Sequence, residues 1–448
     1  MPSTRRRFIS QITTCSLGVA ASSPLVDLFD ARSSRVRAFE VTNNSVLPGL
    51  ETFVPTRQIT RGPKYHWFGY YDKHEFDPSG RYVLANEVSF EGRAPTAKDE
   101  ITVGYVDTHD GDRWVPVGKS VAWGWQQGCM LQWIGIEGRQ LLWNDREDNR
   151  FVCRIYDMQT QQTRTLERPL YTISADGKTG LSINFSRLDN LRPGYGYEGL
   201  KDINVTSRAP EDDGIWRVDI ESGESKLIFS NAEAAAIAWH DGKLRHDAWH
   251  YFNHLLINPS GTRFIFLHRY RPSFDPKTLS FEGNFVTRMF TLGLDGQKPF
   301  VLDPSGMTSH FIWKDNEVAT MWTKPLGLPE GFYEMTDFTD KIRRIGENKM
   351  PVNGHNTYLP APYHEWILND CYPDSKTSRQ TVYLYHPPTD RRIDLGHFPS
   401  PAAYRGEWRC DTHPRVSRDG HLVAIDSPHA NGRQVHLLDI KELLAKHA

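Results

Sequence analysis

Short stretches of alternating apolar and polar residues recur along the chain, each interrupted by a tight turn of Pro, Ser, Asp or Gly. An apolar or aromatic residue precedes each turn and a β-branched run with period two follows it, which predicts two antiparallel strands. Seven such units occur, at residues 74–87, 131–146, 171–187, 254–271, 310–324, 355–374 and 413–427. A unit repeated in this way predicts a single repeat architecture.

Most units continue into two further strands, as at 214–230 and 288–303, where Ser-Gly and Asp-Gly pairs signal hairpins. Four short antiparallel strands, repeated seven times, predict an all-β fold, a seven-bladed β-propeller around a central channel. Two β-sandwiches would share this strand content, but the single turn register favours the propeller. We expect the propeller over residues 56–448, after a linker at 22–55, with one short helix at 439–447.

The N-terminus carries an export pattern. Residues 4–10 match the twin-arginine motif, and a weakly apolar run at 12–21 ends in small residues suited to a signal peptidase. We therefore expect a signal peptide over 1–21 and a periplasmic or extracellular protein. A basic disordered tail is the alternative; a lipoprotein anchored through Cys15 is weaker, because little apolar sequence precedes it. No other stretch approaches the roughly 18 apolar residues of a membrane span.

Composition narrows the choice of ligand. The formal net charge is −2, with 24% charged residues, which argues against a nucleic-acid binder that relies on bulk charge. Local basic groups must then hold any anionic ligand. The four cysteines that follow the signal peptide lack CxxC spacing, so neither a zinc ribbon nor a redox pair is predicted. Cys371 and Cys410 can pair in an oxidising compartment, or remain buried free thiols.

The repeat allows positions to be compared between blades. Histidine stands at one register in the last four units, seven residues before the turn glycine in two of them: His254, His310, His355 and His413. This position begins the innermost strand, whose side chains face the channel mouth. The first blade has Lys73 there and the second Met130, preceded by Gln126 and Gln127.

Imidazoles from adjacent blades can bind a divalent transition metal or exchange protons near neutral pH. A single histidine of this kind is usually structural, but four in register indicate a functional pocket. We expect at most one divalent ion, Mn, Zn or Ca, held by two or three of these histidines with a carboxylate or water, and no organic cofactor. His250 and His268 are nearby alternates.

The second strand of each unit returns to the same face, so its last residues should surround the same mouth. They include Asn144, Asp145, Arg146, Asn184, Arg187, His268, Arg269, Arg271, Lys324, Asn369 and Asp370. Their cations predict an anion-binding mouth, and the planar fork of Arg suits a carboxylate. The long segment 188–213 adds Tyr195 and Tyr197, which can stack on sugar rings at the rim, unless the segment is only a solvated loop.

These residues resemble a known family. The leader, the HWFGYYDK opening at 66–73, the motifs NHLLINPSG, SHFIW and DTHPR, and Tyr171 with Arg187 together resemble the β-propeller polysaccharide lyases. These are the oligogalacturonate lyases and the propeller-type ulvan lyases, and the architectural resemblance covers nearly the whole mature chain. It implies a propeller of the TolB and oligogalacturonate-lyase type and a protein that acts, as a monomer, on an acidic polysaccharide or oligosaccharide.

The resemblance also implies site residues. In the ulvan-lyase branch a tyrosine and an arginine stand sixteen residues apart in one blade, as Tyr171 and Arg187 do here. β-Elimination of a uronate needs a base, an acid and neutralisation of the carboxylate. Tyr171 would be the base or acid and Arg187 the neutralising group. From the register, the strand ends and the segment 188–213, we expect the substrate to be bound by Lys73, Gln126, Gln127, Asn144, Arg146, Tyr195, Tyr197, Arg269 and Arg271.

The chain departs from the family in the preceding blade, where the lyases use histidines and this sequence has Gln126, Gln127 and Asn144. Either His254 takes the missing catalytic role, or a metal ion neutralises the carboxylate as in the oligogalacturonate branch. A third possibility is that only glycan binding remains. A protein-interaction scaffold, or a hydrolase using strand-end carboxylates such as Asp145, Asp370 and Asp426, are the remaining alternatives.

Overall fold

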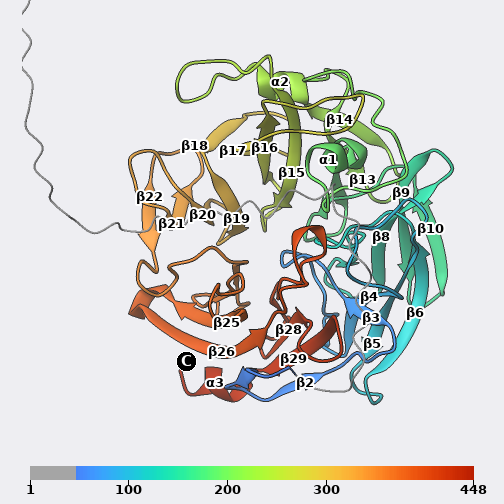
Figure 1. The fold of residues 1–448 in the computed structure, drawn as a ribbon, viewed down its shortest axis with the longest axis vertical. Helices are drawn as coiled ribbons and strands as arrows, with labels where there is room; N and C mark the ends of the chain where they lie inside the picture. The colour runs from blue at the N-terminus through green and yellow to red at the C-terminus, as the bar shows by residue number, and fades with distance from the viewer. Residues whose placement is uncertain (1–46, 448) are drawn as a thin grey trace, which may run out of the picture.

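The computed structural model of the chain describes residues 47–447, so the expected signal peptide lies outside the described residues. Seven antiparallel sheets stand around a central axis (Figure 1), which confirms the seven-bladed propeller. The first strand of each unit is innermost, because residues of these strands line the channel. The structure of 47–447 contains no helix long and apolar enough to cross a membrane.

The first three blades follow sequence order. Their strands are β3 (Tyr65–Trp67), β4 (Tyr82–Val88), β5 (Ile101–Asp107) and β6 (Arg113–Ser120) in blade one; β7 (Gln132–Ile134), β8 (Gln140–Glu147), β9 (Arg150–Asp157) and β10 (Gln162–Leu166) in blade two; and β11 (Thr172–Ile173), β12 (Thr179–Ser182), β13 (Gly214–Asp219) and β14 (Ser225–Ser230) in blade three. Two short helices, α1 (Phe185–Leu191) and α2 (Asn231–Ala235), accompany blade three.

Blades four to six repeat this order. Their strands are β15 (Trp249–Ile257), β16 (Arg263–Arg271), β17 (Val286–Gly293) and β18 (Phe300–Gly306); β19 (Thr308–Trp313), β20 (Val318–Thr323), β21 (Gly331–Thr336) and β22 (Ile342–Ile345); and β23 (Thr357–Tyr358), β24 (Ile367–Asn369), β25 (Arg379–His386) and β26 (Arg391–Pro399). Two 3-10 turns occur, at Pro387–Thr389 and Gly406–Trp408. Facing sheets bury their apolar residues between blades, so β16 is buried at every position except the first.

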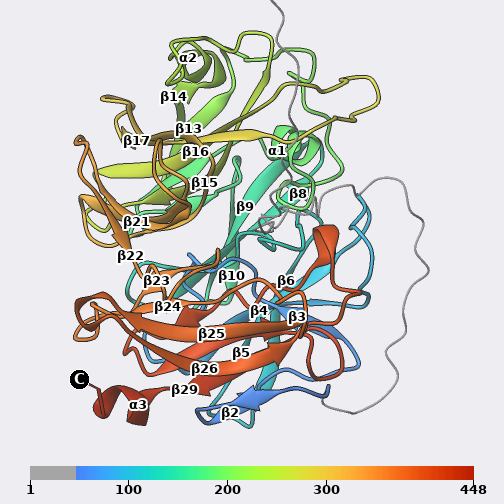
Figure 2. The ribbon, with the colours of Figure 1, turned by 60° about the vertical axis from the view of Figure 1, so that its left-hand side comes forward.

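The ring closes on itself at blade seven. The blade contains β27 (Arg415–Val416), β28 (Leu422–Ser427) and β29 (Gln434–Asp439), and the N-terminal strand β2 (Thr56–Gln58) completes it from outside. Strand β2 lies beside β29 in both views (Figures 1 and 2). Strand β1 (Glu51–Thr52), within the segment expected to be a linker, extends blade six, and α3 (Lys441–Ala445) forms the expected C-terminal helix.

A buried ion network closes the ring from inside. Arg415 of β27 binds Glu75 of blade one through Nε at 2.7 Å and Asp426 of β28 through Nη2 at 3.1 Å. Asp426 in turn accepts hydrogen bonds from the backbone N–H groups of Phe68 and Gly69. Burial raises the pKa of Glu75 to about 7 against the opposing charge of Arg415. The network therefore joins the first and last blades, and Asp426 is structural rather than a free carboxylate.

The histidine register coincides with irregular backbone. One extra residue enters the inner strand between Asn253 and Leu256, and again between Thr308 and Phe311, so both places are β-bulges. Met130, His254 and His413, which share this register, have φ values of 58°, 52° and 39°. Left-handed backbone at a bulky residue is uncommon and concentrates at functional sites. The two bulges turn His254 and His310 out of the regular pleat.

Blade one contributes a plug to the channel. Strand β3 pairs with β4 up to Trp67, and pairing resumes at Glu75, whose carbonyl accepts from the N–H of Leu84. The residues between, Phe68–His74, leave the sheet, and the Tyr71 hydroxyl exchanges hydrogen bonds with the backbone N–H and carbonyl of Phe311 in blade five. The plug (Phe68–His74) thus reaches from blade one to blade five across the channel.

The closing network gives the first prediction. Replacing Arg415 with Met leaves two buried carboxylates without their partner, so the free energy of unfolding should fall by about 3–5 kcal/mol. Equilibrium unfolding in guanidinium chloride measures this change in the free energy of unfolding. Arg57→Met, which removes the exposed ion pair between β2 and Asp112, is the control and should cost less than about 1 kcal/mol. Equal losses in the two variants would contradict the structural role of the network.

Candidate functional site

Three of the four register histidines gather on one side of the plug. The ring centroids of His310 and His355 are 4.0 Å apart, and those of His355 and His413 are 4.2 Å apart. His355 and His413 join Asp411 in a buried group whose ligand atoms all lie within 4.8 Å of one another. We call His355, Asp411 and His413 the metal-type cluster.

The cluster carries unsatisfied donors and acceptors. Neither Nε2 of His355 nor Nε2 of His413 has a hydrogen-bond partner among the described residues, although both atoms are buried. The Asp411 carboxylate lies 3.8 Å from the His413 nitrogen. Buried polar atoms are normally paired, so unpaired nitrogens that converge with a carboxylate fit a bound cation. Two nitrogens and one oxygen form a donor set suited to a divalent transition metal.

Asp370 orients the cluster from behind. Its carboxylate accepts from the backbone N–H and Nδ1 of His355 at 2.7 and 2.9 Å, from Oγ1 of Thr412 at 2.6 Å and from the N–H of His413 at 3.1 Å. Burial alone would raise the pKa of Asp370, but the charge and hydrogen bonds of His355 lower it. A carboxylate that fixes the far nitrogen of a histidine is the usual outer partner of a metal ligand.

His310 stands at the edge of the cluster. Its Nδ1 lies 3.0 Å from Oδ1 of Asn353, and its Nε2 lies 3.5 Å from the hydroxyl of Tyr372. Burial, with a smaller contribution from His355, holds the pKa of His310 well below its usual value, and burial does the same to His413. Both rings are therefore neutral near pH 7, the form in which imidazole binds a metal.

His254 lies apart from the other three. Its Nε2 is 3.2 Å from the carboxylate of Asp72, which also binds Lys73 at 2.8 Å, and its ring stacks on Phe311 at 4.0 Å. Burial would raise the pKa of Asp72, but Lys73 and His254 lower it to about 2. His254 and Lys73 thus both bind the buried carboxylate of Asp72 in the plug. In this position, His254 does not serve as a metal ligand and Lys73 does not serve as a substrate ligand.

Tyr70 of the plug links these groups. Its ring centroid lies 4.9 Å from His254, 5.2 Å from His413 and 6.2 Å from His355. No hydrogen bond to its hydroxyl is found in the described part of the chain. The plug therefore supplies the aromatic floor of the histidine end of the channel.

Tyr171 meets His254, as expected, but its hydroxyl is fully engaged. It bonds with the side chains of Gln127 and Asn253 and accepts from the backbone N–H of His254 at 2.9 Å. Burial raises the pKa of Tyr171 above its usual range. The hydroxyl thus fixes the left-handed backbone at His254, and its bonds leave no position for a substrate proton.

Arg187 does not end a strand. Strand β12 ends at Ser182, and Arg187 lies inside α1, whose N-cap Asn184 accepts from the Arg187 N–H. Its guanidinium binds Asp202 at 3.2 Å and the carbonyls of His250, Asn204, Ser207 and Arg208. With every donor occupied, Arg187 anchors the long segment 188–213, and the expected position of Arg187 at the end of a strand is wrong.

Several other expected residues also hold this segment. Asn144 bonds with the backbone of Leu170 and with the hydroxyl of Tyr197, whose ring stacks on Phe185 at 4.3 Å. Arg146 donates to the carbonyls of Ala97 and Glu198. His250 and His268, the alternates, bond to each other at 2.8 Å. These contacts are structural and lie within the scaffold of blades one to four.

Tyr195 does reach the cluster, through Arg409. Nη2 of Arg409 donates to the Tyr195 hydroxyl at 2.9 Å, and its Nε donates to Asp411 at 2.7 Å. Gln126 positions this arginine by donating to the carbonyls of Glu407 and Arg409. Burial would raise the pKa of Tyr195, but the guanidinium charges of Arg409 and Arg192 bring it below the usual value. The segment 188–213 thus places a polarised phenol beside the cluster.

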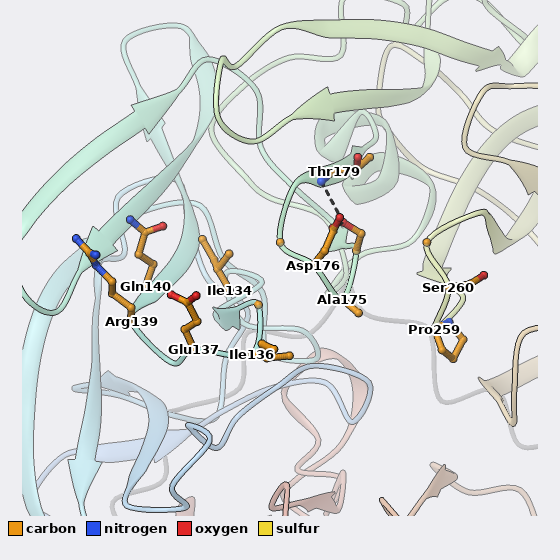
Figure 3. Close-up of a pocket in the computed structure, with 14 residues that line it drawn as sticks. Ile134, Ile136, Glu137, Arg139, Gln140, Ala175, Asp176, Thr179, Pro259 and Ser260 are labelled. Atoms are coloured by element: carbon orange, nitrogen blue, oxygen red, sulfur yellow. Dashed lines mark hydrogen bonds between the residues drawn. The ribbon is translucent and has the colours of Figure 1, made fainter.

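The larger cavities lie at the other end of the inner strands. A channel of about 520 Å³ is lined by the residues that follow each register histidine, such as Ile257, Trp313 and Val416, and by the plug. A groove of about 880 Å³ crosses the turns of blades two to four (Figure 3). Its labelled residues, such as Ile136, Asp176 and Ser260, come from three separate turns and form no cluster of metal ligands.

Sequence reasoning missed Arg409 and Asp411. The register comparison finds the histidines, but Asp411 lies two residues before the register, within the DTHPR motif. A carboxylate two residues before a register histidine was the signal in the sequence that could have identified Asp411. Asp370 was noted only as a strand-end carboxylate. All four cysteines in the described part of the chain are free thiols, so Cys371 and Cys410 do not pair.

Comparison with known proteins supports the fold. No family model and no curated protein matches the chain. An oligogalacturonate lyase solved in complex with manganese superposes with a TM-score of 0.60 at 13% identity, covering 90% of this chain and 97% of that one. An oligogalacturonate lyase from Vibrio parahaemolyticus gives 0.59 at 14% identity, covering 88% and 97%. The chain therefore has the oligogalacturonate-lyase fold, as the sequence resemblance implied.

The Tyr195–Arg409 contact predicts an early-titrating phenol. In a spectrophotometric pH titration of tyrosinate absorbance, the wild-type protein should show a step below the usual tyrosine pKa, and Tyr195→Phe should remove it. Tyr171→Phe should retain that step, because the pKa of Tyr171 is raised by burial. A step that persists in Tyr195→Phe would contradict the assigned electrostatics.

Proposed function

We propose that the protein is a metal-dependent polysaccharide lyase that cleaves a uronate-containing polysaccharide or oligosaccharide by β-elimination. The observation that carries the proposal is the convergence of the metal-type cluster with Tyr195 through a single guanidinium, that of Arg409. The shared fold with oligogalacturonate lyases supports the reaction class. The twin-arginine pattern at residues 4–10 supports export to the periplasm or outside the cell.

The reaction has three requirements. A base removes the proton on C5 of the uronate, a C4–C5 double bond forms, and the C4–O4 bond breaks with a proton delivered to the leaving oxygen. Negative charge builds on the carboxylate as C5 loses its proton, so cationic groups must face that carboxylate. The products are a 4,5-unsaturated uronate and a shortened chain with a free hydroxyl.

The residues present fit a divalent cation held by His355, Asp411 and His413. The two imidazole nitrogens favour manganese or zinc over calcium, which prefers oxygen ligands alone. When bound, such an ion supplies positive charge toward the uronate carboxylate. Asp370 keeps the imidazole of His355 oriented and holds the backbone of His413, and the side chain of Arg409 keeps Asp411 in place.

Tyr195 is the proton-transfer group in this proposal. Its hydroxyl accepts from Arg409, and no acceptor for its own proton is found among residues 47–447. Arg409 therefore orients the phenol and stabilises its anion. The hydroxyl of Tyr171 makes all its hydrogen bonds within the protein, so it does not act on a substrate. Tyr195 takes the role that the sequence resemblance gave to Tyr171, and the cation takes the neutralising role that it gave to Arg187.

Activity has a direct assay. Incubation with polygalacturonate or another uronate polymer should produce the ultraviolet absorbance of a 4,5-unsaturated uronate, and a chelator should abolish it until manganese is restored. Asp370→Asn should weaken manganese binding by about 10- to 100-fold, as loss of an outer partner does. Saccharide binding without this absorbance across a broad uronate panel would sink the lyase proposal and leave a glycan-binding propeller.

Tyr195→Phe should lower kcat by about 10²- to 10⁴-fold, the usual contribution of a positioned proton-transfer group. Manganese binding should stay unchanged, which separates this effect from damage to the cluster. Tyr105→Phe, on the outer strand β5, is the matched control and should keep wild-type kcat. Steady-state kinetics with the substrate found above provides the measurement, and a kcat unchanged in Tyr195→Phe would exclude the assigned role.

A further inference from the structure

Three arginines gather around one aromatic ring beside Tyr195. The guanidinium carbons of Arg192, Arg269 and Arg271 lie 4.6, 4.5 and 5.5 Å from the ring centroid of Phe285. Arg269 and Arg271 point from the same face of β16, and Arg192 follows α1. We call these three residues the arginine cluster.

Arg269 has donor capacity that the protein does not use. Its Nε donates to Oγ1 of Thr287 at 3.1 Å, but its Nη1 is buried and has no hydrogen-bond partner in the described chain. The residue is only 6% exposed. An unpaired, buried guanidinium donor is costly, which makes such a group a candidate for binding an anion.

No carboxylate neutralises Arg269 or Arg271 within the described residues. Other buried arginines differ: Arg415 binds Glu75 and Asp426, and Arg409 binds Asp411. Arg271 donates only to the carbonyls of Leu191 and Gly283. The two cations of β16 therefore stand close together in a desolvated place without a counter-charge.

The electrostatics agree with this geometry. Burial lowers the pKa of Arg269, and the neighbouring Arg192 adds to the effect against the opposing influence of Tyr251. Burial likewise lowers the pKa of Arg271 to about 10, with contributions from Arg192 and Arg269. Like charges held together at this cost are stabilised when an anion binds among them.

Tyr195 connects the arginine cluster to the metal-type cluster. The guanidinium of Arg192 lies 4.6 Å from the Tyr195 ring, while the Tyr195 hydroxyl binds Arg409, which binds Asp411. A continuous series of contacts therefore runs from Arg192 through Tyr195 and Arg409 to Asp411 of the metal-type cluster.

We propose that the arginine cluster binds the carboxylate of a second uronate, next to the uronate that reacts at the metal-type cluster. This inference rests on the proposed lyase function and names its substrate class. The substrate has uronates on neighbouring sugars, as a polyuronide does, rather than uronates that alternate with neutral sugars. The planar fork of arginine matches a carboxylate, and Phe285 supports the guanidinium groups through cation–π contacts.

The test uses binding, so it does not depend on turnover. Isothermal titration of the manganese-loaded protein with trigalacturonate and with its methyl ester compares the carboxylate with its neutral form. The wild-type protein should bind the acid about 10- to 100-fold more tightly, as expected for charged hydrogen bonds. Arg269→Gln should lose most of this preference, and Arg269→Lys, which keeps the charge without the fork, should fall between them.

Arg113→Gln is the matched control, because Arg113 forms an exposed ion pair with Asp110 on the outer strand β6. It should bind as the wild-type protein does. Unchanged discrimination between the acid and its ester in both Arg269 variants would overturn the inference, as would failure of trigalacturonate to bind. The inference would also fail if a trisaccharide of neutral sugars that carries sulfate groups bound as tightly as trigalacturonate. If discrimination depends on Arg269 but no unsaturated product forms, the subsite stands and only the lyase proposal fails.

Discussion

The carboxylate of Asp370 is the interaction on which the site depends. It lies at the end of β24 and accepts hydrogen bonds from His355 in its own blade and from Thr412 and His413 in the next. A buried carboxylate is stable only when its oxygens are fully bonded, so this arrangement fixes two blades relative to each other. Nε2 of His355, opposite its bond to Asp370, is then left unpaired in the group that also contains Asp411 and His413. Blade packing and site geometry thus share one cause.

The plug explains why the two ends of the channel differ. Phe68–His74 leaves blade one and reaches blade five through Tyr71, so its residues contact the register histidines and also line the 520 Å³ channel. Polar side chains gather on the histidine side, where the segment 188–213 adds Tyr195. The plug also binds His254 to Asp72, which removes one register histidine from the cluster.

Periodicity in the sequence predicted the seven blades, the channel and the histidine register, because each repeat must bury the same apolar face. It did not predict contacts between blades. Arg187 was misassigned because Asn184 caps a helix where a strand was expected to continue. Asp202, which lies far along the loop, forms an ion pair with its guanidinium. Arg409 lies outside the repeated unit, so its bonds to Tyr195 and Asp411 arise only in three dimensions.

The central claim is that His355, Asp411 and His413 hold one divalent cation. Anomalous scattering at the manganese edge, from crystals grown with manganese, tests it directly. The account predicts a single peak within bonding distance of Nε2 of His355, Nε2 of His413 and a carboxylate oxygen of Asp411, and no peak in crystals of His413→Ala. A manganese peak elsewhere in the channel, or none in the wild-type protein, would contradict it.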